Sequence, residues 1–168
     1  MTDAASLAGL AAVADKLEII EVCTRVHWSY DHEDWDALDG LFAATVSMPT
    51  LAQVSEHGFD PDGYLSHYLF TREDVKRALR AVKTGLVTQH LIAGHQVTLH
   101  GNRAVCLAHS INVHLPNGDL VLHGNEYRFD LTRTAEGWRI RGWVPRIRWS
   151  HGDGSSYNAA ARQAAWLE

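Results

Sequence analysis

The hydrophobic positions of the chain follow a helical spacing in its first part. Apolar residues recur every three or four positions from Leu17 to Tyr30, which predicts a helix over about 13–31. Asp31 follows Ile20 by eleven positions, and at about 100° per residue this separation places the two side chains on the same face. A carboxylate on a buried face is costly unless a charged or hydrogen-bonding group meets it. Asp31 is therefore expected to have a partner inside the protein.

Two shorter helices are expected next. Asp34 is placed to cap a brief helix, and Thr71 is placed to cap another over 72–82. Between them the sequence predicts a short strand at 46–48 and a long irregular loop over 53–68, which is rich in glycine, aspartate and histidine.

After Gly85 the pattern changes to strands joined by short turns. The expected strands are 90–100, 103–115, 120–132 and 137–149. Helices followed by antiparallel strands are typical of an α+β domain with its helices on one face of the sheet. We expect a strongly curved mixed or antiparallel sheet, closed by helices into a cone-shaped barrel with a pocket inside.

Composition indicates one globular domain. The chain has 168 residues, 46% of them hydrophobic, and we assign the domain to 14–150, with an N-terminal extension at 1–13 and a C-terminal tail at 151–168 that is helix-compatible at its end. A formal charge of −5 without a basic run argues against nucleic acid and an anionic membrane surface. Two cysteines in apolar segments and no membrane-spanning or signal-like stretch favour a cytoplasmic protein with free thiols.

His109 is a candidate base. On the strand 103–115 it shares a face with four apolar residues, Val105, Leu107, Ile111 and Val113. A histidine among apolar neighbours needs a partner, and Asp31 is the carboxylate best placed to orient it as a base. The alternative is a core histidine that bonds only to a backbone carbonyl.

His90 is a candidate for a second proton-transfer group, because strand ends often border the mouth of a pocket; the alternative is a surface histidine.

His90, His95 and His100 are five apart, so a regular strand alternates them between faces, and the chain has no metal-ligand spacing. A metal held by Asp31, His90 and His109 is an alternative, but we expect no metal. Without a Gly-rich phosphate loop or a nucleophile elbow, we also expect no cofactor.

Three further residues are candidates for binding a substrate. Arg146 and Arg148 share a strand face, and one of them could bind a substrate oxygen at the pocket mouth; the alternative is an exposed pair at an interface. His27 lies four residues before Asp31 on the same helix face, where it could line the pocket and tune that carboxylate.

The last strand also predicts self-association. An open sheet face carrying Trp138, Trp143 and Trp149 would expose a large apolar patch. We therefore expect a homo-oligomer, a dimer or a trimer.

Several of these residues together resemble scytalone dehydratase and, more broadly, the polyketide-cyclase-like (SnoaL-like) branch of the nuclear-transport-factor-2-like superfamily. The resemblance covers about 14–150. It is carried by the order and spacing of Tyr30-Asp31-x-x-Asp34-Trp35-Asp36, Thr88-Gln89-His90-Leu91-Ile92-x-Gly94, His109 and Ile147-Arg148-Trp149.

The resemblance implies a cone-shaped fold, no cofactor, and elimination of water from a small cyclic or polyketide-like hydroxyketone. Carried over, it makes Asp31 and His109 a paired acid–base unit, His90 a second proton-transfer group, and Tyr30 a donor to a water or carbonyl.

The resemblance also marks two places where this chain differs from the family or aligns loosely with it. Thr50 stands where the family has a second tyrosine, and Asn125 is the choice for an asparagine of the third long strand. A departure at Thr50 weakens any two-tyrosine clamp on a carbonyl, which leaves the exact substrate open.

Two other readings of the same residues remain. The acid–base pair could serve an isomerisation, an aldol cyclisation or the loss of another leaving group, because one fold supports many reactions. The domain could also be a non-catalytic module that binds a small ligand.

Overall fold

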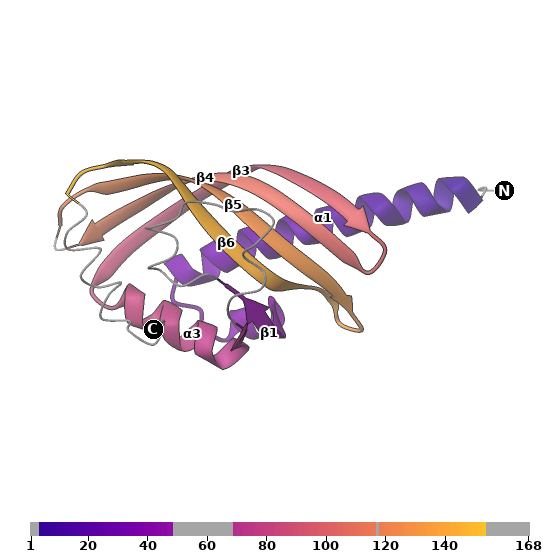
Figure 1. Ribbon diagram of the computed structural model, residues 1–168, viewed down its shortest axis with the longest axis horizontal. Helices are drawn as coiled ribbons and strands as arrows, with labels where there is room; N and C mark the ends of the chain where they lie inside the picture. The colour runs from indigo at the N-terminus through magenta and orange to yellow at the C-terminus, as the bar shows by residue number, and fades with distance from the viewer. Residues whose placement is uncertain (1–3, 49–68, 117, 154–168) are drawn as a thin grey trace.

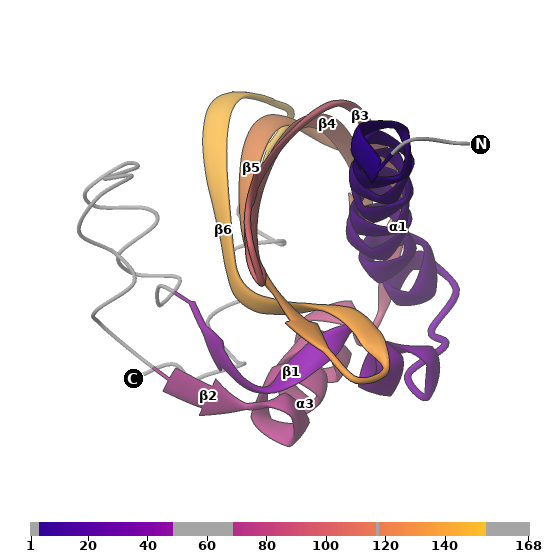
Figure 2. The same ribbon diagram turned by 90° about the vertical axis from the view of Figure 1, so that its right-hand side faces the viewer.

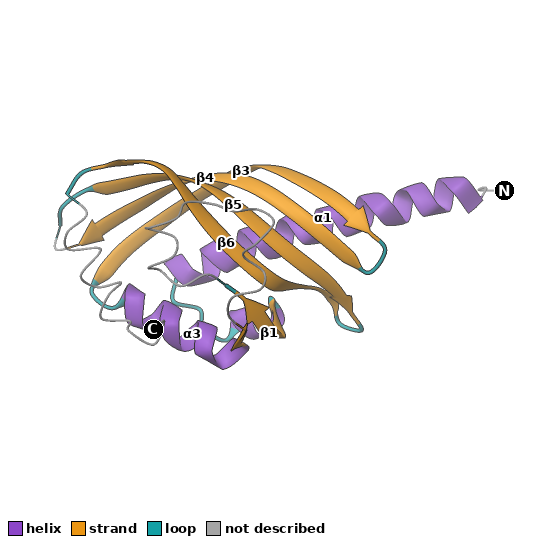
Figure 3. Ribbon diagram, viewed as in Figure 1, coloured by secondary structure: helices purple, strands orange, loops and turns teal. Residues whose placement is uncertain are grey.

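The described residues form two helices that pack on a curled sheet (Figures 1 and 3). The computed structural model describes residues 4–48, 69–116 and 118–153. In chain order the elements are α1 (Ala4–Asp31), the 3-10 turn η1 (Ala37–Gly40), β1 (Phe42–Ser47), β2 (Leu69–Thr71), α3 (Arg72–Lys83), β3 (Leu86–His100), β4 (Arg103–Pro116), β5 (Val121–Thr134) and β6 (Gly137–His151).

Helix α1 is longer than the sequence pattern predicts. It begins at Ala4 instead of near residue 13, so most of the expected N-terminal extension is helical. Its first turns project beyond the sheet and leave Leu7 and Leu10 exposed (Figure 1). Its second half packs on the sheet and buries Ile19 and Cys23 completely. The helix therefore ends, at Asp31, against the inside of the molecule.

The predicted capping of α3 is confirmed. The Thr71 hydroxyl accepts a hydrogen bond from the Asp74 backbone N–H, and the Asp74 carboxylate accepts one from the Thr71 N–H, which together form a capping box. The short helix expected at Asp34 is instead a single 3-10 turn, with the Asp34 carboxylate accepting from the N–H of Ala37. Its brevity lets the chain enter β1 at Phe42.

The sheet has six strands in the order β2-β1-β6-β5-β4-β3. Strand β1 pairs parallel with β6, and all other neighbours are antiparallel, so the sheet is mixed. It curls around its concave side, and α1 lies along the opening (Figure 2). The expected α+β fold is confirmed, with a sheet that is curled but not closed.

The concave face of the sheet holds the core. On β5 the side chains of Tyr127, Phe129 and Leu131 point inward and are buried. They pack with Trp138 and Trp143 of β6 and with the buried face of α1. Because Trp138 and Trp143 belong to the core, the expectation that they lie on an exposed sheet face is wrong.

Strand β4 presents the opposite face to the one its apolar residues suggest. Ser110, Asn112 and His114 are buried on the concave side, whereas Leu107 and Ile111 are exposed on the convex side. The pattern is reversed because this part of the concave face lines a polar cluster and not the apolar core.

Some expectations lie outside the described residues: the loop over 53–68, the position of Thr50, and the helix-compatible end of the tail. Within the part of the chain that the structure describes, no helix is both long and apolar enough to span a membrane.

The same substitution, leucine to alanine, at one position on each face of the sheet tests which face is buried. Leu131→Ala, which empties a fully buried position, is expected to lower the free energy of unfolding by roughly 2–5 kcal/mol. Leu107→Ala, on the convex face, is expected to lower it by about 1 kcal/mol or less. Urea denaturation followed by circular dichroism measures both, and equal losses would contradict the assignment.

Candidate active site

The carboxylate at the end of α1 meets the first half of β3. Asp31 Oδ1 accepts hydrogen bonds from Thr88 Oγ1 and from His90 Nδ1, each at 2.7 Å, and Oδ2 accepts one from the His90 backbone N–H at 2.7 Å. The His90 and Asp31 side chains are only 6% and 9% exposed. The expected interior partner of Asp31 therefore exists, and it is His90.

These bonds fix the charge of Asp31. Burial by itself would raise the pKa of Asp31, but the hydrogen bonds from His90 and Thr88 and the charge of His90 outweigh it and lower that pKa to about 2. Asp31 is ionised near neutral pH and has no proton to donate. His90 Nδ1 must then carry the proton of this bond, so Nε2 is the ring nitrogen that can act as a base.

The hydrogen-bond chain continues to α3. Thr88 Oγ1, which donates to Asp31, accepts from Lys83 Nζ at 2.7 Å. The ammonium group also lies over the ring of Tyr30, 5.5 Å from its centroid, and the Tyr30 ring is 5.6 Å from that of His90. Burial lowers the pKa of Lys83, while the charges of Asp31 and Glu33 oppose that change.

Two more histidines adjoin His90 on the concave face. The His114 ring is 5.7 Å from that of His90 and nearly perpendicular to it, and the His123 ring is 5.1 Å from that of His114. Burial, with the charges of His90 and His123, lowers the pKa of His114 to about 3. Burial and the charge of His90 also lower the pKa of His123. Both rings are thus neutral at physiological pH and can act as hydrogen-bond donors and acceptors.

A series of hydrogen-bonded side chains on β4 and β5 lies on the same concave face. Ser110 Oγ donates to Asn112 Oδ1 at 2.7 Å, and Asn112 Nδ2 donates to the Tyr127 hydroxyl oxygen at 2.8 Å. Burial raises the pKa of Tyr127, so its hydroxyl stays protonated. The strand register places these side chains near the histidines, because Asn112 pairs with His90 of β3 on one side and with His123 of β5 on the other.

His27 lies beneath the dyad in an aromatic setting. Its ring is 5.2 Å from that of His90 and 4.7 Å from that of Tyr127. Nδ1 is 3.1 Å from the Cys23 carbonyl, so it carries the proton and Nε2 is an acceptor; among the described residues no group hydrogen-bonds to this Nε2. Burial and the charge of His90 lower the pKa of His27 to about 3. Its use in binding a substrate stays a prediction.

The predicted pairing of Asp31 with His109 is wrong. His109 is exposed on the convex face of β4, opposite Glu126 of β5, while Asp31 bonds to His90 on the concave side. The error follows from assigning the apolar face of β4 to the interior. His90 therefore takes the place that the sequence interpretation gave to His109.

The prediction that Arg146 or Arg148 faces the pocket is also wrong. Glu126 lies on the convex side, and its carboxylate is 3.5 Å from Arg146 Nη1 and 3.3 Å from Arg148 Nη1. The alternative, a pair on the outer surface, is the arrangement observed. Asn125, by contrast, is buried on the concave face, and its role in binding stays a prediction.

Seven residues of the cluster were missed by the sequence interpretation: Lys83, Thr88, Ser110, Asn112, His114, His123 and Tyr127. One signal could have found several of them. Ser110, Asn112 and His114 alternate along β4 as a polar row, which marks a face that lines a polar site as readily as one that meets water.

The geometry of β3 bears on the metal alternative. A bulge between Ala93 and Gln96, where Gly94 has φ 68°, shifts the alternation so that His90 and His95 both face α1. Even so, the described ranges contain no group of three or more histidine, cysteine or acidic side chains arranged to hold a metal ion.

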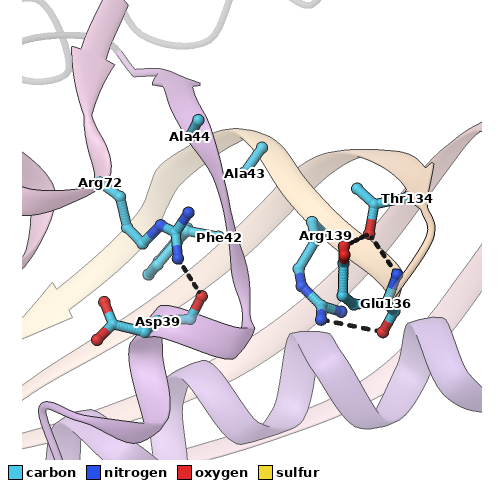
Figure 4. A pocket seen from close by; sticks show the side chains of 8 residues that line it. All are labelled: Asp39, Phe42, Ala43, Ala44, Arg72, Thr134, Glu136 and Arg139. Carbon is cyan, nitrogen blue, oxygen red and sulfur yellow. Dashed lines mark hydrogen bonds between the residues drawn. The ribbon is translucent and has the colours of Figure 1, made fainter.

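A separate hollow lies beside β1 (Figure 4). Its volume is about 480 Å³, and its lining is Asp39, Phe42, Ala43, Ala44, Arg72, Thr134, Glu136 and Arg139. Its two guanidinium groups donate to backbone carbonyls, Arg72 to Asp39 and Arg139 to Glu136. It shares no residue with the Asp31–His90 cluster, which remains the candidate site.

The buried histidines predict a specific acid sensitivity. The pKa values of His27 and His114 fall to about 3 on folding, so the unfolded chain binds protons that the native protein excludes. Stability is full above about pH 6.5, the pKa of an unfolded histidine, and is lost as the pH falls from there towards 3. His27→Gln should reduce this slope of unfolding free energy against pH.

His32→Gln is the matched control. His32 makes the same bond from Nδ1 to the carbonyl four residues earlier, at 2.9 Å to Trp28, but it is exposed to water. Urea titrations at several pH values measure the slopes. Equal slopes for the wild type and His27→Gln would refute the expectation.

Comparison with known proteins agrees with the fold. The profile of the SnoaL-like domain matches residues 11–144. No protein with a curated description matches the chain. Among solved structures, the Kfla4162 protein of Kribbella flavida is 25% identical, with a TM-score of 0.71 over 90% of this chain and 99% of that one.

Two structures from Novosphingobium aromaticivorans are also similar. A nuclear-transport-factor-2-like protein with a cystatin-like fold is 23% identical, with a TM-score of 0.67 over 98% of this chain and 97% of that one. A protein provisionally named scytalone dehydratase is 13% identical, with a TM-score of 0.65 over 86% of this chain and 89% of that one. The fold and the profile, which spans most of the sequence, lead to one conclusion: the chain belongs to the SnoaL-like domain family.

Proposed function

We propose that this protein is a cofactor-independent lyase that eliminates water from a small cyclic or polyketide-like hydroxyketone by acid–base catalysis. The observation that carries the proposal is the buried Asp31–His90 pair, in which the carboxylate holds His90 in the tautomer that leaves Nε2 free to accept a proton. Asp31 and His90 are the proposed catalytic unit, and Tyr30 is the proposed donor to substrate oxygen.

The proposed reaction needs a base, an acid and a donor to a developing enolate. His90 Nε2 removes the proton next to the ketone, and the electron pair of that C–H bond moves towards the carbonyl oxygen. Hydroxyl groups such as that of Tyr30 stabilise the negative charge on this oxygen. The imidazolium, paired with Asp31, then returns its proton to the departing hydroxyl, which leaves as water while the C=C bond forms.

The surroundings support this chemistry. Neutral His114 and the hydroxyl of Tyr127 provide donors that burial keeps in one protonation state. The adjoining core is aromatic and aliphatic, and electrostatic interactions next to such a core are stronger than in water. A substrate with a planar or cyclic carbon frame and two oxygen functions matches this mixture of apolar and polar groups.

Isomerisation and cyclisation would use the same pair, and product mass separates them from dehydration. Cyclic hydroxyketones that raise the melting temperature are incubated with the protein, and products are analysed by mass spectrometry. A dehydration lowers the product mass by that of one water, whereas isomerisation leaves it unchanged. Binding without any conversion would favour the alternative of a ligand-binding module.

The catalytic pair is tested by Asp31→Asn and His90→Gln. Each is expected to lower kcat by roughly 10²–10⁴-fold, because each removes the positioned base or the group that orients it. His109→Gln is the matched control: the same substitution on the convex face should leave kcat near the wild-type value. Circular dichroism checks that all three variants fold, and a wild-type rate for folded His90→Gln would refute the proposed mechanism.

We also propose that a second copy of the chain covers the convex face. Leu91, Ile111 and Trp149 form a line across β3, β4 and β6, and each is about half exposed. The Trp149 indole fills the space over Gly124, where an added Cβ would lie 2.1 Å from it, so the apolar line is continuous. The neighbouring Glu126 and its two arginines present both charges, which suits a self-complementary contact.

Analytical ultracentrifugation tests this interface. The wild type is expected to sediment as a dimer or trimer at micromolar concentration. Ile111→Arg should sediment as a folded monomer, because it buries an unpaired charge in the contact. Leu69→Arg, at an exposed position on β2, should leave the oligomer intact. An unchanged oligomer in Ile111→Arg would exclude this face.

A further inference from the structure

Lys83 is a buried cation that contacts the candidate dyad through a hydroxyl. The residue is 5% exposed, and its Nζ donates to Thr88 Oγ1 at 2.7 Å. Thr88 in turn donates to Asp31 Oδ1 at 2.7 Å. A buried ammonium group costs free energy unless charge and hydrogen bonds compensate it. Here the compensating charge is the carboxylate of the dyad, one hydroxyl away.

The charged groups at the two ends of this series of hydrogen bonds, Lys83 and Asp31, determine which atom donates in each bond. An ammonium group has only donors and an ionised carboxylate has only acceptors. Thr88 has a single hydroxyl proton, so it must accept from Lys83 and donate to Asp31. Lys83 therefore orients Thr88 towards Asp31, and Asp31 in turn orients the ring of His90. The direction of every bond from α3 to the base follows from the charge of Lys83.

The charge of Lys83 also acts on the pair that Asp31 forms with His90. A lone buried Asp31 favours the imidazolium form of His90, because that form completes an ion pair. The Lys83 cation partly neutralises Asp31 and repels a second positive charge nearby. The cation of Lys83 therefore favours the neutral ring of His90. This is the form that can accept a proton from the substrate, and the ring returns to it once the proton is released.

A purely structural explanation covers less of the geometry. A lysine at the end of α3 interacts well with the helix dipole, and its ammonium lies over the ring of Tyr30. Lys76, on the same helix and equally buried, shows the ordinary arrangement: it pairs directly with Asp39 at 2.9 Å and with Glu73 at 3.5 Å. Lys83 differs because, among the described residues, it pairs with no carboxylate directly and instead donates to Thr88, which donates to Asp31 of the site.

We propose that Lys83 is a positioning residue of the active site, which acts through Thr88 and Asp31 to keep His90 neutral and correctly oriented. The inference rests on the proposed function for its catalytic consequence. It specifies the resting charge of the site as one cation, one carboxylate and one neutral imidazole.

Other titratable groups also face His90. His27 and Tyr30 approach it from α1, together with Asp31; His114 approaches it from β4; and His123 acts on it from β5. These groups are unchanged in a Lys83 variant, so a difference between variant and wild type reports on the ammonium charge.

The experiment compares Lys83→Met with Lys76→Met. Lys83→Met keeps most of the side-chain volume but removes the charge, and the acid limb of kcat/KM is expected to move up by about one pH unit. At a pH below that limb, kcat then falls by about tenfold while KM changes little, because one pH unit is a tenfold change in the population of the base. Lys76→Met removes an equally buried charge and should leave the limb in place.

A second pair of variants keeps the proposal testable if Lys83→Met does not fold. Thr88→Val breaks the link between Lys83 and Asp31 and should lower kcat, whereas Thr88→Ser preserves the hydroxyl and should restore it. A Lys83→Met protein whose acid limb matches that of Lys76→Met would overturn the proposal. So would equal kcat values for Thr88→Val and Thr88→Ser.

A measurement without substrate separates this proposal from the proposed reaction. In protein labelled at its histidines, the His90 ring resonances are followed by NMR from acid to neutral pH. They should titrate at higher pH in Lys83→Met than in the wild type. Such a shift together with no dehydration would refute the reaction and leave the role of Lys83 standing; no shift would refute the role of Lys83 whatever the reaction.

Discussion

The requirement that a buried carboxylate be fully hydrogen-bonded organises the inside of this protein. Asp31 ends α1 with its side chain shielded from water, and three donors from β3 meet it, two of them from His90. This contact joins the helix to β3, the strand at the edge of the sheet. It also determines the state of the site, because an ionised Asp31 forces the proton of His90 onto Nδ1.

Polar groups inside the sheet carry a cost, and the structure shows how this cost is limited. His27 and His114 are neutral, since burial makes their imidazolium forms unfavourable. Asn112 and Tyr127 satisfy each other. The charged groups, Asp31 and Lys83, are compensated through Thr88. The two charges of the site are thus compensated next to an apolar core that excludes water.

Much of the fold was predictable because local signals agree with the tertiary structure. The capping box at Thr71, the turns after His100 and Thr134, and the helical spacing before Asp31 each act over a few residues. Of the candidate site, Asp31 and His90 were proposed from their positions along the helix and strand, and Tyr30 was proposed only from the family resemblance. His109 was misassigned, because on β4 the more apolar face is the outer one, and periodicity gives the two faces without saying which is inside.

By itself, the sequence determined helix α3, the second half of α1, the four long strands, their order and the need of Asp31 for a partner, since spacing, capping and the cost of burying a charge are local properties. Tertiary structure alone decided which histidine meets that carboxylate, which face of β4 is internal, and that Lys83 belongs to the same chain of hydrogen bonds. These contacts join residues more than fifty positions apart for Asp31 and His90. They depend on strand register, on the bulge in β3 and on the curl of the sheet, which arise only when all the strands pack together.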